Sequence, residues 1–498
     1  MTVTMRRSDW LWLGGILGLA LVLRAIKLDA GLWFDEIVTL VDYVRLPTRE
    51  LLTTYTTFNN HILFSLEAQA SIALFGESAW SLRLPALIYG VASIAALWWL
   101  ARLVASPWEA HLAALLMAVS YHHVWFSQNA RGYAGLLFWT LLATVIFVRN
   151  MRRPSWWPWV GYAFVMAAAV YTHLTAAFFF AAQGIVYVVL LVSRRLGIRA
   201  GGNWGNDPDG EITNLKPLFG FVLGGLLVLA LYTPLLSQIA GKLGEVLVAP
   251  AEKVVPEVWK SPIWTVLEIV RSVQNLGLIM SVGLPAALIF IFIGLASFLK
   301  HQPVFAAFYL VHIPLTLGAL LAFSFNIWPR FFFVDMGFVL LSLVRGVFVV
   351  AGYFARILKT RERWRVSGNT LGVAATLAGV VVSLFLLLPN YRYPKQDFVG
   401  ARDFIEASRA ADDRVASFGL ATVAFARYYA PDWEVVETPE QLDRLRDGRR
   451  VWVVFAFPGR TKSSYPEIMD SIASDFDHVK TFPGTLGSGE VLVYRSRQ

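Results

Sequence analysis

Long apolar runs recur along most of the chain, and each is long enough to cross a lipid bilayer as a helix. The hydrocarbon core is about 30 Å thick, so a spanning helix needs roughly 20 mainly apolar residues. The pattern predicts about eleven spans, at residues 9–27, 80–103, 109–126, 133–149, 157–172, 174–193, 217–239, 277–298, 303–323, 332–355 and 367–389. The sequence therefore predicts a mainly α, polytopic membrane protein.

Two long segments are too polar to span. Residues 28–79 carry apolar positions at helical spacing in EIVTLVDYV and ILFSLEAQASIALF, which predicts short helices lying in the membrane interface. From Asn390 the composition changes, and strand-like runs (RVASFGL, WEVVE, RRVWVVFAF, GEVLVYR) alternate with helical patterns (FVGARDFIEA, PEQLDRLRDG, YPEIMDSIASDF). We therefore expect a transmembrane domain at residues 1–389 and a small soluble α/β domain at residues 390–498.

The basic residues indicate an orientation in the membrane. They fall mainly in short clusters between apolar runs, such as Arg6-Arg7, RNMRR and RILKTRERWR, which positive-inside statistics place in the cytoplasm. An amino terminus inside and an odd number of spans then put residues 390–498 outside. The first apolar run has no small-residue cleavage signature after it, so we expect a retained first helix in a multi-pass plasma-membrane protein.

Composition narrows the function classes. The chain is 57% hydrophobic and 15% charged, as expected of a protein whose main solvent is lipid. Its net charge of +9 does not require a nucleic-acid partner, because orientation in the bilayer explains the basic clusters. The absence of cysteine excludes disulfides, thiolate nucleophiles and cysteine metal sites.

Two adjacent carboxylates, Asp35 and Glu36 in LWFDEIVTL, directly follow the first span. Such a pair at a membrane boundary is costly unless it faces water, a cation or another partner. A structural alternative is a helix cap, in which Asp35 accepts a hydrogen bond from the free backbone of a helix that starts at Glu36. The residues alone leave both interpretations open.

The same face is predicted to receive polar side chains from the ends of several spans: His61, Gln128, Arg131, Tyr133, His173 and Arg330. An arginine can hold a phosphate through a forked pair of hydrogen bonds. Each residue also has an ordinary alternative, because an interfacial arginine can reach to lipid headgroups and a histidine at a helix end can be a satisfied polar contact. Polar groups gathered at one face are what a lipid-substrate site needs.

A divalent metal is left open. His61, His173, Glu36 and Glu67 could be brought together by the fold, but they show no ligand spacing of a recognised metal motif. We therefore assign no metal site and expect no required cofactor.

Several motifs in order, LWFDE, NNHILFSL, FGESAWSLRLPALIYGV, YHHVWFSQNARGYA and WPRFFF, resemble the GT-C superfamily of glycosyltransferases. The chain is most similar to bacterial relatives of protein O-mannosyltransferases and of the aminoarabinose transferase that modifies lipid A (families 39 and 83). The similarity covers about residues 10 to 190 well and 300 to 390 loosely. Where many relatives have His-Pro-Pro, this chain has His61-Ile62-Leu63.

The resemblance implies a membrane glycosyltransferase that moves a sugar from a polyprenyl-phosphate donor to a hydroxyl of a lipid, glycan or protein, by inversion at the extracytoplasmic face. It implies that Asp35 is the catalytic carboxylate and Glu36 its supporting neighbour, and that Arg131 and Arg330 bind the donor phosphate. The other substrate-site residues are expected to be His61, Gln128, Tyr133 and His173. Since a polyprenyl phosphate is a good leaving group, the reaction needs a base but no strong general acid.

Two other classes compete. A polytopic transporter or flippase of lipids or solutes also has many spans, but transporters tend to place ionisable residues near the midplane between two related halves, and no such halves are visible. A non-catalytic assembly or sensor protein would account for the soluble tail but not for the polar residues gathered at one face.

Overall fold

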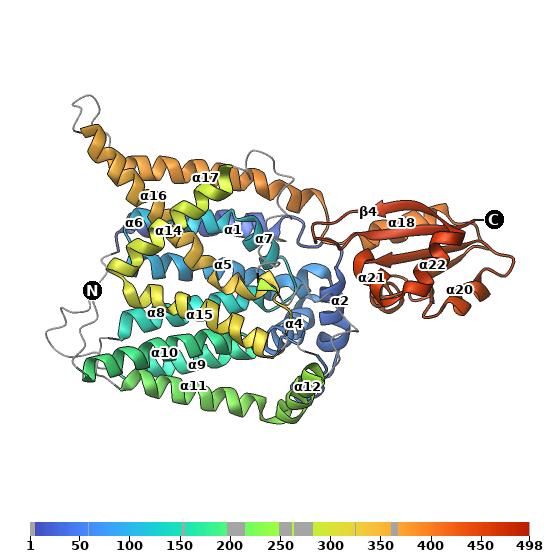
Figure 1. Ribbon diagram of the computed structural model, residues 1–498, viewed down its shortest axis with the longest axis horizontal. Helices are drawn as coiled ribbons and strands as arrows, with labels where there is room; N and C mark the ends of the chain where they lie inside the picture. Colours follow the sequence, from blue (N-terminus) through green and yellow to red (C-terminus); the bar gives the residue numbers. More distant parts are fainter. Residues whose placement is uncertain are drawn as a thin grey trace.

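The computed structural model describes residues 5–57, 59–151, 155–196, 215–248, 261–262, 282–323, 325–359 and 367–497. Its larger part is a bundle of long helices, and its C-terminal part is a smaller sheet-containing region at one end of that bundle (Figure 1). The amino-terminal end of the chain lies at the opposite end (Figure 1).

The bundle contains these helices: α1 (Arg7–Ala25), α5 (Ala79–Val104), α6 (Pro107–Ala118), α7 (Tyr121–Ser127), α8 (Tyr133–Asn150), α9 (Trp157–Thr172), α10 (Ala176–Arg195), α11 (Lys216–Tyr232), η3 (Thr233–Leu235), α12 (Leu236–Val248), α14 (Leu284–His301), α15 (Pro303–Ala322), η7 (Pro329–Asp335), α16 (Met336–Lys359) and α17 (Gly368–Arg392). Within the described ranges, nine helical segments are long and apolar enough to cross a membrane. The prediction of a mainly α, multi-pass membrane protein is confirmed.

Three of the predicted spans differ in detail. The span predicted at 109–126 is broken into α6 and α7, which are separated by Val119 and Ser120. The span predicted at 157–172 is α9, which is not among the nine segments that are long enough to cross a membrane. At 1.5 Å per residue its 16 residues reach only about 24 Å, which is less than the thickness of the hydrocarbon core. The span predicted at 277–298 is described only from residue 282, and α14 begins at Leu284.

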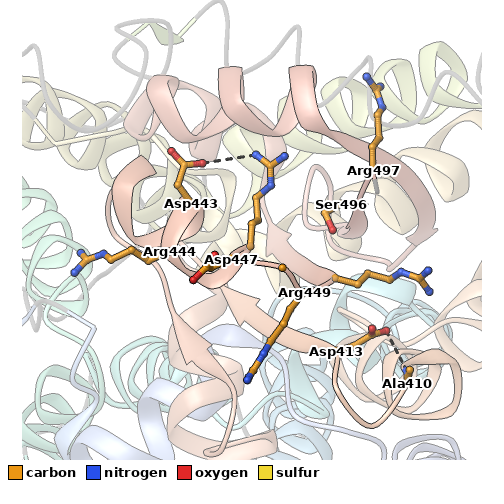
Figure 2. A pocket seen from close by; sticks show the side chains of 11 residues that line it. Ala410, Asp413, Asp443, Arg444, Asp447, Arg449, Ser496 and Arg497 are labelled. Carbon is orange, nitrogen blue, oxygen red and sulfur yellow. Dashed lines mark hydrogen bonds and ion pairs between the residues drawn. The ribbon is translucent and has the colours of Figure 1, made fainter.

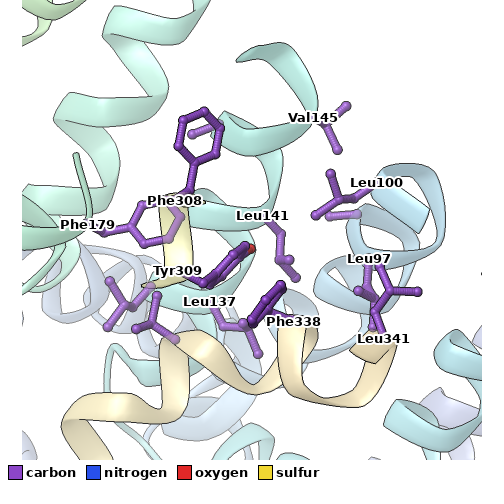
Figure 3. Close-up of a cluster of buried hydrophobic side chains, with 14 of the residues drawn as sticks. Leu97, Leu100, Leu137, Leu141, Val145, Phe179, Phe308, Tyr309, Phe338 and Leu341 are labelled. Atoms are coloured by element: carbon purple, nitrogen blue, oxygen red, sulfur yellow. The ribbon is translucent and has the colours of Figure 1, made fainter. Parts of the chain in front are cut away.

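The bundle helices pack through a continuous apolar core. Figure 3 shows part of it, where α5, α8, α10, α15 and α16 bring together Leu97, Leu141, Phe179, Tyr309 and Phe338. The rings of Tyr309 and Phe338 stack with centroids 4.2 Å apart. On α14 and α17, large apolar side chains such as Phe292 and Phe385 are exposed, as expected of helices that face lipid.

The segment between α1 and α5 folds over the end of the bundle that adjoins the C-terminal region (Figure 1). It forms α2 (Phe34–Thr39), the π-helical turn η1 (Leu40–Val44), α3 (Thr48–Thr53) and α4 (Ile62–Phe75). The helices expected in EIVTLVDYV and ILFSLEAQASIALF are thus present. They place the start of α2, with both carboxylates, between the bundle and the C-terminal region.

The C-terminal region contains α18 (Phe398–Ser408), β1 (Arg414–Ser417), α19 (Ala421–Ala424), η8 (Phe425–Tyr429), β2 (Glu434–Val435), α20 (Pro439–Leu445), β3 (Val451–Ala456), α21 (Pro458–Ser464), α22 (Pro466–Asp475), β4 (Phe476–Phe482) and β5 (Val491–Ser496). The strand order is β2-β1-β3-β5-β4. β1 pairs in parallel with β2 and β3, whereas β5 pairs antiparallel with β3 and β4. All residues of the central strand β3 are buried.

The predicted α/β character of this region is confirmed, with two differences. The four expected strands and three expected helices are present, but β4 was not predicted, because polar residues fill its middle and only its two phenylalanine ends are buried. In addition, α17 continues to Arg392, beyond the boundary expected at residue 389.

Candidate active site

Asp35 lies in the first turn of α2. The cap residue of this helix is Trp33, and the helix begins at Phe34. The side chain that bonds back to the cap is that of Glu36, whose Oε2 accepts from the Trp33 backbone N–H at 3.3 Å. The capping alternative for Asp35 is therefore not what the structure shows.

The Asp35 carboxylate faces two arginines. Arg131 Nη1 donates to Asp35 Oδ2, and Arg330 Nη1 lies 3.4 Å from the same oxygen. The Asp35 side chain is 13% exposed, and its Oδ1 accepts no hydrogen bond from any described residue. One oxygen is thus held by cations, and the other has no partner among the described residues.

Arg131 lies between α7 and α8, in the run SQNARGYA. Its side chain is 2% exposed. Besides Asp35, it donates from Nη2 to Asn59 Oδ1 and from Nε to His61 Nε2 at 3.2 Å. Its guanidinium also lies over the Tyr133 ring, 5.4 Å from the centroid. Since all three of its nitrogens already donate, these contacts favour a positioning role, and the predicted phosphate contact of Arg131 stays a prediction.

Arg330 is the more accessible cation. It lies in the 3₁₀ helix η7, between α15 and α16, and its side chain is 36% exposed. Its Nε is buried and has no hydrogen-bond partner among the described residues. The far end of η7 is anchored by a 2.9 Å hydrogen bond between His312 Nδ1 and Asp335 Oδ1. Runs of 3₁₀ helix this long are uncommon and often mark functional segments.

Glu36 and Arg83 of α5 form a buried ion pair behind Asp35. The two hydrogen bonds run from Nε to Oε1 at 2.7 Å and from Nη2 to Oε2 at 2.5 Å. Glu36 Oε1 also accepts from the Ala130 backbone N–H at 2.8 Å, and Arg83 Nη1 donates to the carbonyls of Leu28 and Ala30. Glu36 therefore supports its neighbour by joining the segment before α2 to the run that carries Arg131.

His61 and His173 lie side by side at the edge of the site. Their ring centroids are 4.7 Å apart, and Tyr133 lies 5.5 and 5.1 Å from them. His61 Nε2 accepts from Arg131, so Nδ1 carries the hydrogen that points to the Thr172 carbonyl at 3.2 Å. Burial and the charge of Arg131 hold the pKa of His61 well below its usual value, and the same causes lower the pKa of His173 to about 3. Both rings are neutral, which leaves Asp35 as the carboxylate base of the cluster.

Gln128 is not brought to Asp35. Its Nε2 donates to the carbonyls of Arg24 at 3.0 Å and Ile26 at 2.7 Å, and its Oε1 accepts from Asn390 at 2.8 Å. These contacts join the end of α1 to the end of α17, so Gln128 has a structural role in this arrangement. The substrate contact predicted for it stays a prediction.

The four residues weighed as metal ligands do not converge. His61 and His173 are neighbours, but Glu36 is taken up by its ion pair, and Glu67 accepts a hydrogen bond from Tyr89. Across the described residues, no three His, Asp or Glu side chains lie close enough to hold a metal ion.

Sequence reasoning missed Arg83 and Asn59. An arginine inside an apolar span is expensive without a partner, so Arg83 in SLRLPAL was a signal for a buried carboxylate. Asn59 precedes His61 by two residues and contacts Arg131, but nothing in its sequence distinguishes it from other loop asparagines.

A cavity of about 920 Å³ lies on the C-terminal region and is rich in arginine (Figure 2). Asp413, Asp443, Arg444, Arg449 and Arg497 are among its lining residues. None of the predicted site residues lines it, so it is separate from the cluster around Asp35.

Comparisons with known proteins agree with this fold. Residues 62–201 match the model of the dolichyl-phosphate-mannose-protein mannosyltransferase family. No curated protein sequence matches the chain. Among solved structures, the chain is similar to the apo state of ArnT from Cupriavidus metallidurans, with a TM-score of 0.51, 12% identity and coverage of 98% of this chain and 97% of that chain.

It is also similar to the archaeal oligosaccharyltransferase AglB from Archaeoglobus fulgidus, in a complex with an inhibitory peptide and a dolichol-phosphate. That match has a TM-score of 0.50 and 12% identity, and it covers 98% of this chain and 74% of AglB. At these identities the likeness is one of fold.

Proposed function

We propose that this chain, whose predicted resemblance to GT-C superfamily glycosyltransferases the family model and the fold confirm, is a membrane enzyme that transfers a sugar from a polyprenyl-phosphate donor. The acceptor is a hydroxyl group of a lipid, glycan or protein, and the anomeric centre is inverted. The observation that carries the proposal is the state of Asp35, whose Oδ2 is held by Arg131 while Oδ1 has no partner among the described residues.

In this mechanism the Asp35 carboxylate removes the proton of the acceptor hydroxyl as its oxygen attacks the anomeric carbon. The bond from that carbon to the phosphate oxygen breaks, and the phosphate leaves with the electron pair. Arg330 is the cation placed to bind the leaving phosphate, because its guanidinium is partly exposed and its Nε is unpartnered among the described residues. Preplaced donors of this kind stabilise the charge that develops on a leaving group.

Local charge balance supports an anionic donor. Glu36 neutralises Arg83, and both histidines are neutral, so the cluster around Asp35 has one carboxylate and the two guanidinium groups of Arg131 and Arg330. The surplus positive charge is complementary to a phosphate. Arg131 contributes to this field while it fixes the orientation of Asp35.

The matched family model and one of the similar structures support a polyprenyl-phosphate donor. The matched family model is named for dolichyl-phosphate-mannose, a sugar on a polyprenyl phosphate, and AglB was solved with a dolichol-phosphate. These facts concern those proteins, and they come to this chain as support for the proposal.

We further propose that the amino terminus is cytoplasmic and that the C-terminal region lies outside the plasma membrane. The basic clusters support this orientation, as does the position of the two chain ends at opposite ends of the bundle (Figure 1). A reporter fused after Gln498 and active only in the cytoplasm would contradict it.

The proposal is tested with the lipid fraction of cells that lack this protein. A polyprenyl-phosphate sugar should accumulate there, and purified protein should consume it in the presence of the cell-envelope fraction that contains the acceptor. Absence of both accumulation and consumption would contradict the proposed function.

A further inference from the structure

The C-terminal region holds the segment that leads into Asp35. Tyr429 donates its hydroxyl hydrogen to the Leu32 carbonyl at 2.9 Å, and the Phe34 backbone N–H donates to Gln396 Oε1 at 3.1 Å. The rings of Phe34 and Phe457 meet edge to face, with centroids 5.9 Å apart. The residues on either side of the catalytic turn are therefore packed against elements from the other end of the sequence.

The region is also tied to the bundle at independent points. Lys395 Nζ donates to the Gln128 carbonyl at 2.5 Å, and Trp125 Nε1 donates to Thr485 Oγ1 at 3.2 Å. With several contacts at different places, the C-terminal region has a defined position relative to Asp35.

Helix α19 packs against α2, and α21 lies on the side of this region that faces α2 (Figure 1). The residue before α21, Phe457, has φ = +55°, a left-handed conformation that is uncommon for an aromatic residue. At this turn the Phe457 ring rests on Phe34, the residue before Asp35, and α21 begins at the next residue, Pro458.

Arg460 lies three residues after Phe457, in the first turn of α21. Its side chain is exposed, and it makes no hydrogen bond or ion pair with any described residue. Its charge interacts with that of Asp35: nearby protein atoms lower the pKa of Arg460, whereas the Asp35 carboxylate opposes that shift. Because Phe457 contacts the residue before Asp35, the first turn of α21, which carries Arg460, lies near Asp35.

Arg330 and Arg460 approach Asp35 from different parts of the molecule. Arg330 belongs to η7 of the membrane bundle, from which a lipid-borne phosphate must arrive. Arg460 belongs to the C-terminal region, which lies at the end of the bundle, on the side left for a substrate that does not arrive through the bundle (Figure 1).

We propose that Arg460 binds an anionic group of the acceptor, a phosphate or a carboxylate close to the reacting hydroxyl. This inference rests on the proposed function. A guanidinium offers a forked pair of hydrogen bonds that suits both anions.

The test uses the full-length protein in detergent, with farnesyl phosphate as the donor-side probe. In the presence of saturating farnesyl phosphate, binding of glycerol 1-phosphate and of glycerate is compared with that of neutral glycerol by calorimetry. Arg460→Gln should weaken binding of the anionic probe about tenfold to a hundredfold, as expected for a lost hydrogen bond to a charged group. Its affinity for farnesyl phosphate should not change.

Arg449→Gln is the matched control, because Arg449 lines the separate arginine-rich cavity of the same region (Figure 2). It should bind both probes as the wild type does. Arg460→Lys, which keeps the charge, should recover part of the lost binding and thereby separates a local defect from unfolding of α21.

Several results would overturn the inference: wild-type protein that binds neither anionic probe, an Arg460→Gln variant that binds them normally, or an equal loss in Arg449→Gln. Weaker farnesyl phosphate binding in Arg460→Gln would place Arg460 in the donor site instead. Failure of the proposed function would appear separately, as wild-type protein that does not bind farnesyl phosphate.

Discussion

The Arg83 guanidinium and the Glu36 carboxylate form a two-point ion pair in which both side chains are almost completely buried, at 2% and 0% exposure. The pair joins α5 to the start of α2, and through Ala130 it also reaches the run that carries Arg131. Glu36 thus pairs with the buried Arg83, and this ion pair holds the first turn of α2, in which Asp35 lies.

Glu36→Gln should therefore act mainly on stability. Removing one charge leaves Arg83 buried without its counterion, which typically costs about 3–5 kcal/mol. The expected result is a large fall in Tm in detergent, with transfer lost as the folded fraction falls. Glu77→Gln is the control, because the Arg45–Glu77 pair is 42% and 38% exposed and should contribute no more than about 1 kcal/mol. Equal Tm values for both variants would contradict the structural role of Glu36.

Much of the fold could be predicted because its signals are local. Apolar runs of bilayer length mark most spans, and short apolar strand-like runs mark β1, β3 and β5. The prediction failed where tertiary contacts decide. At the break between α6 and α7, Arg24 of α1 donates a hydrogen bond to the Ala118 carbonyl. No pattern within residues 109–126 contains that information.

The candidate site was predictable only in part. Asp35, Arg131, Arg330, His61 and His173 lie together, and the span pattern of the sequence places all five at one membrane face. The different contacts of Arg131 and Arg330 depend on neighbours such as Asn59. The position of Arg460 near Asp35 depends on how the C-terminal region packs against the bundle. Both are consequences of tertiary structure, and the span pattern contains neither.

The two arginines beside Asp35 should respond differently to replacement by lysine. Arg330→Lys should raise KM for the polyprenyl-phosphate sugar, because a point ammonium cannot reproduce a fork on phosphate. Arg131→Lys should mainly lower kcat, because lysine cannot contact Asp35, Asn59 and His61 together. Steady-state kinetics with the lipid donor distinguishes the two. A rise in donor KM alone for Arg131→Lys would return that residue to the phosphate site.

Lys395 should give the protein a distinctive pH dependence of stability. Burial lowers the pKa of Lys395 from 10.5 to about 7, although the Glu36 carboxylate raises it. Between these values the unfolded chain binds a proton that the folded chain lacks, so this residue makes stability rise with pH from about 7 to about 10.5. Lys395→Met should remove that contribution, so its Tm should rise less than that of the wild type between pH 6.5 and pH 9. Parallel Tm curves would contradict the buried state of this amine.

The most direct test of the account is sugar transfer by purified Asp35→Asn protein at saturating donor and acceptor, with Tm measured on the same sample. Asn keeps the size of the side chain and can still accept from Arg131, but it has no useful proton affinity. Loss of a positioned base typically lowers the rate by about a hundredfold to ten-thousandfold. The account predicts a folded variant that binds polyprenyl phosphate and transfers sugar at a rate reduced to that extent. A stable Asp35→Asn protein with near-normal turnover would contradict it.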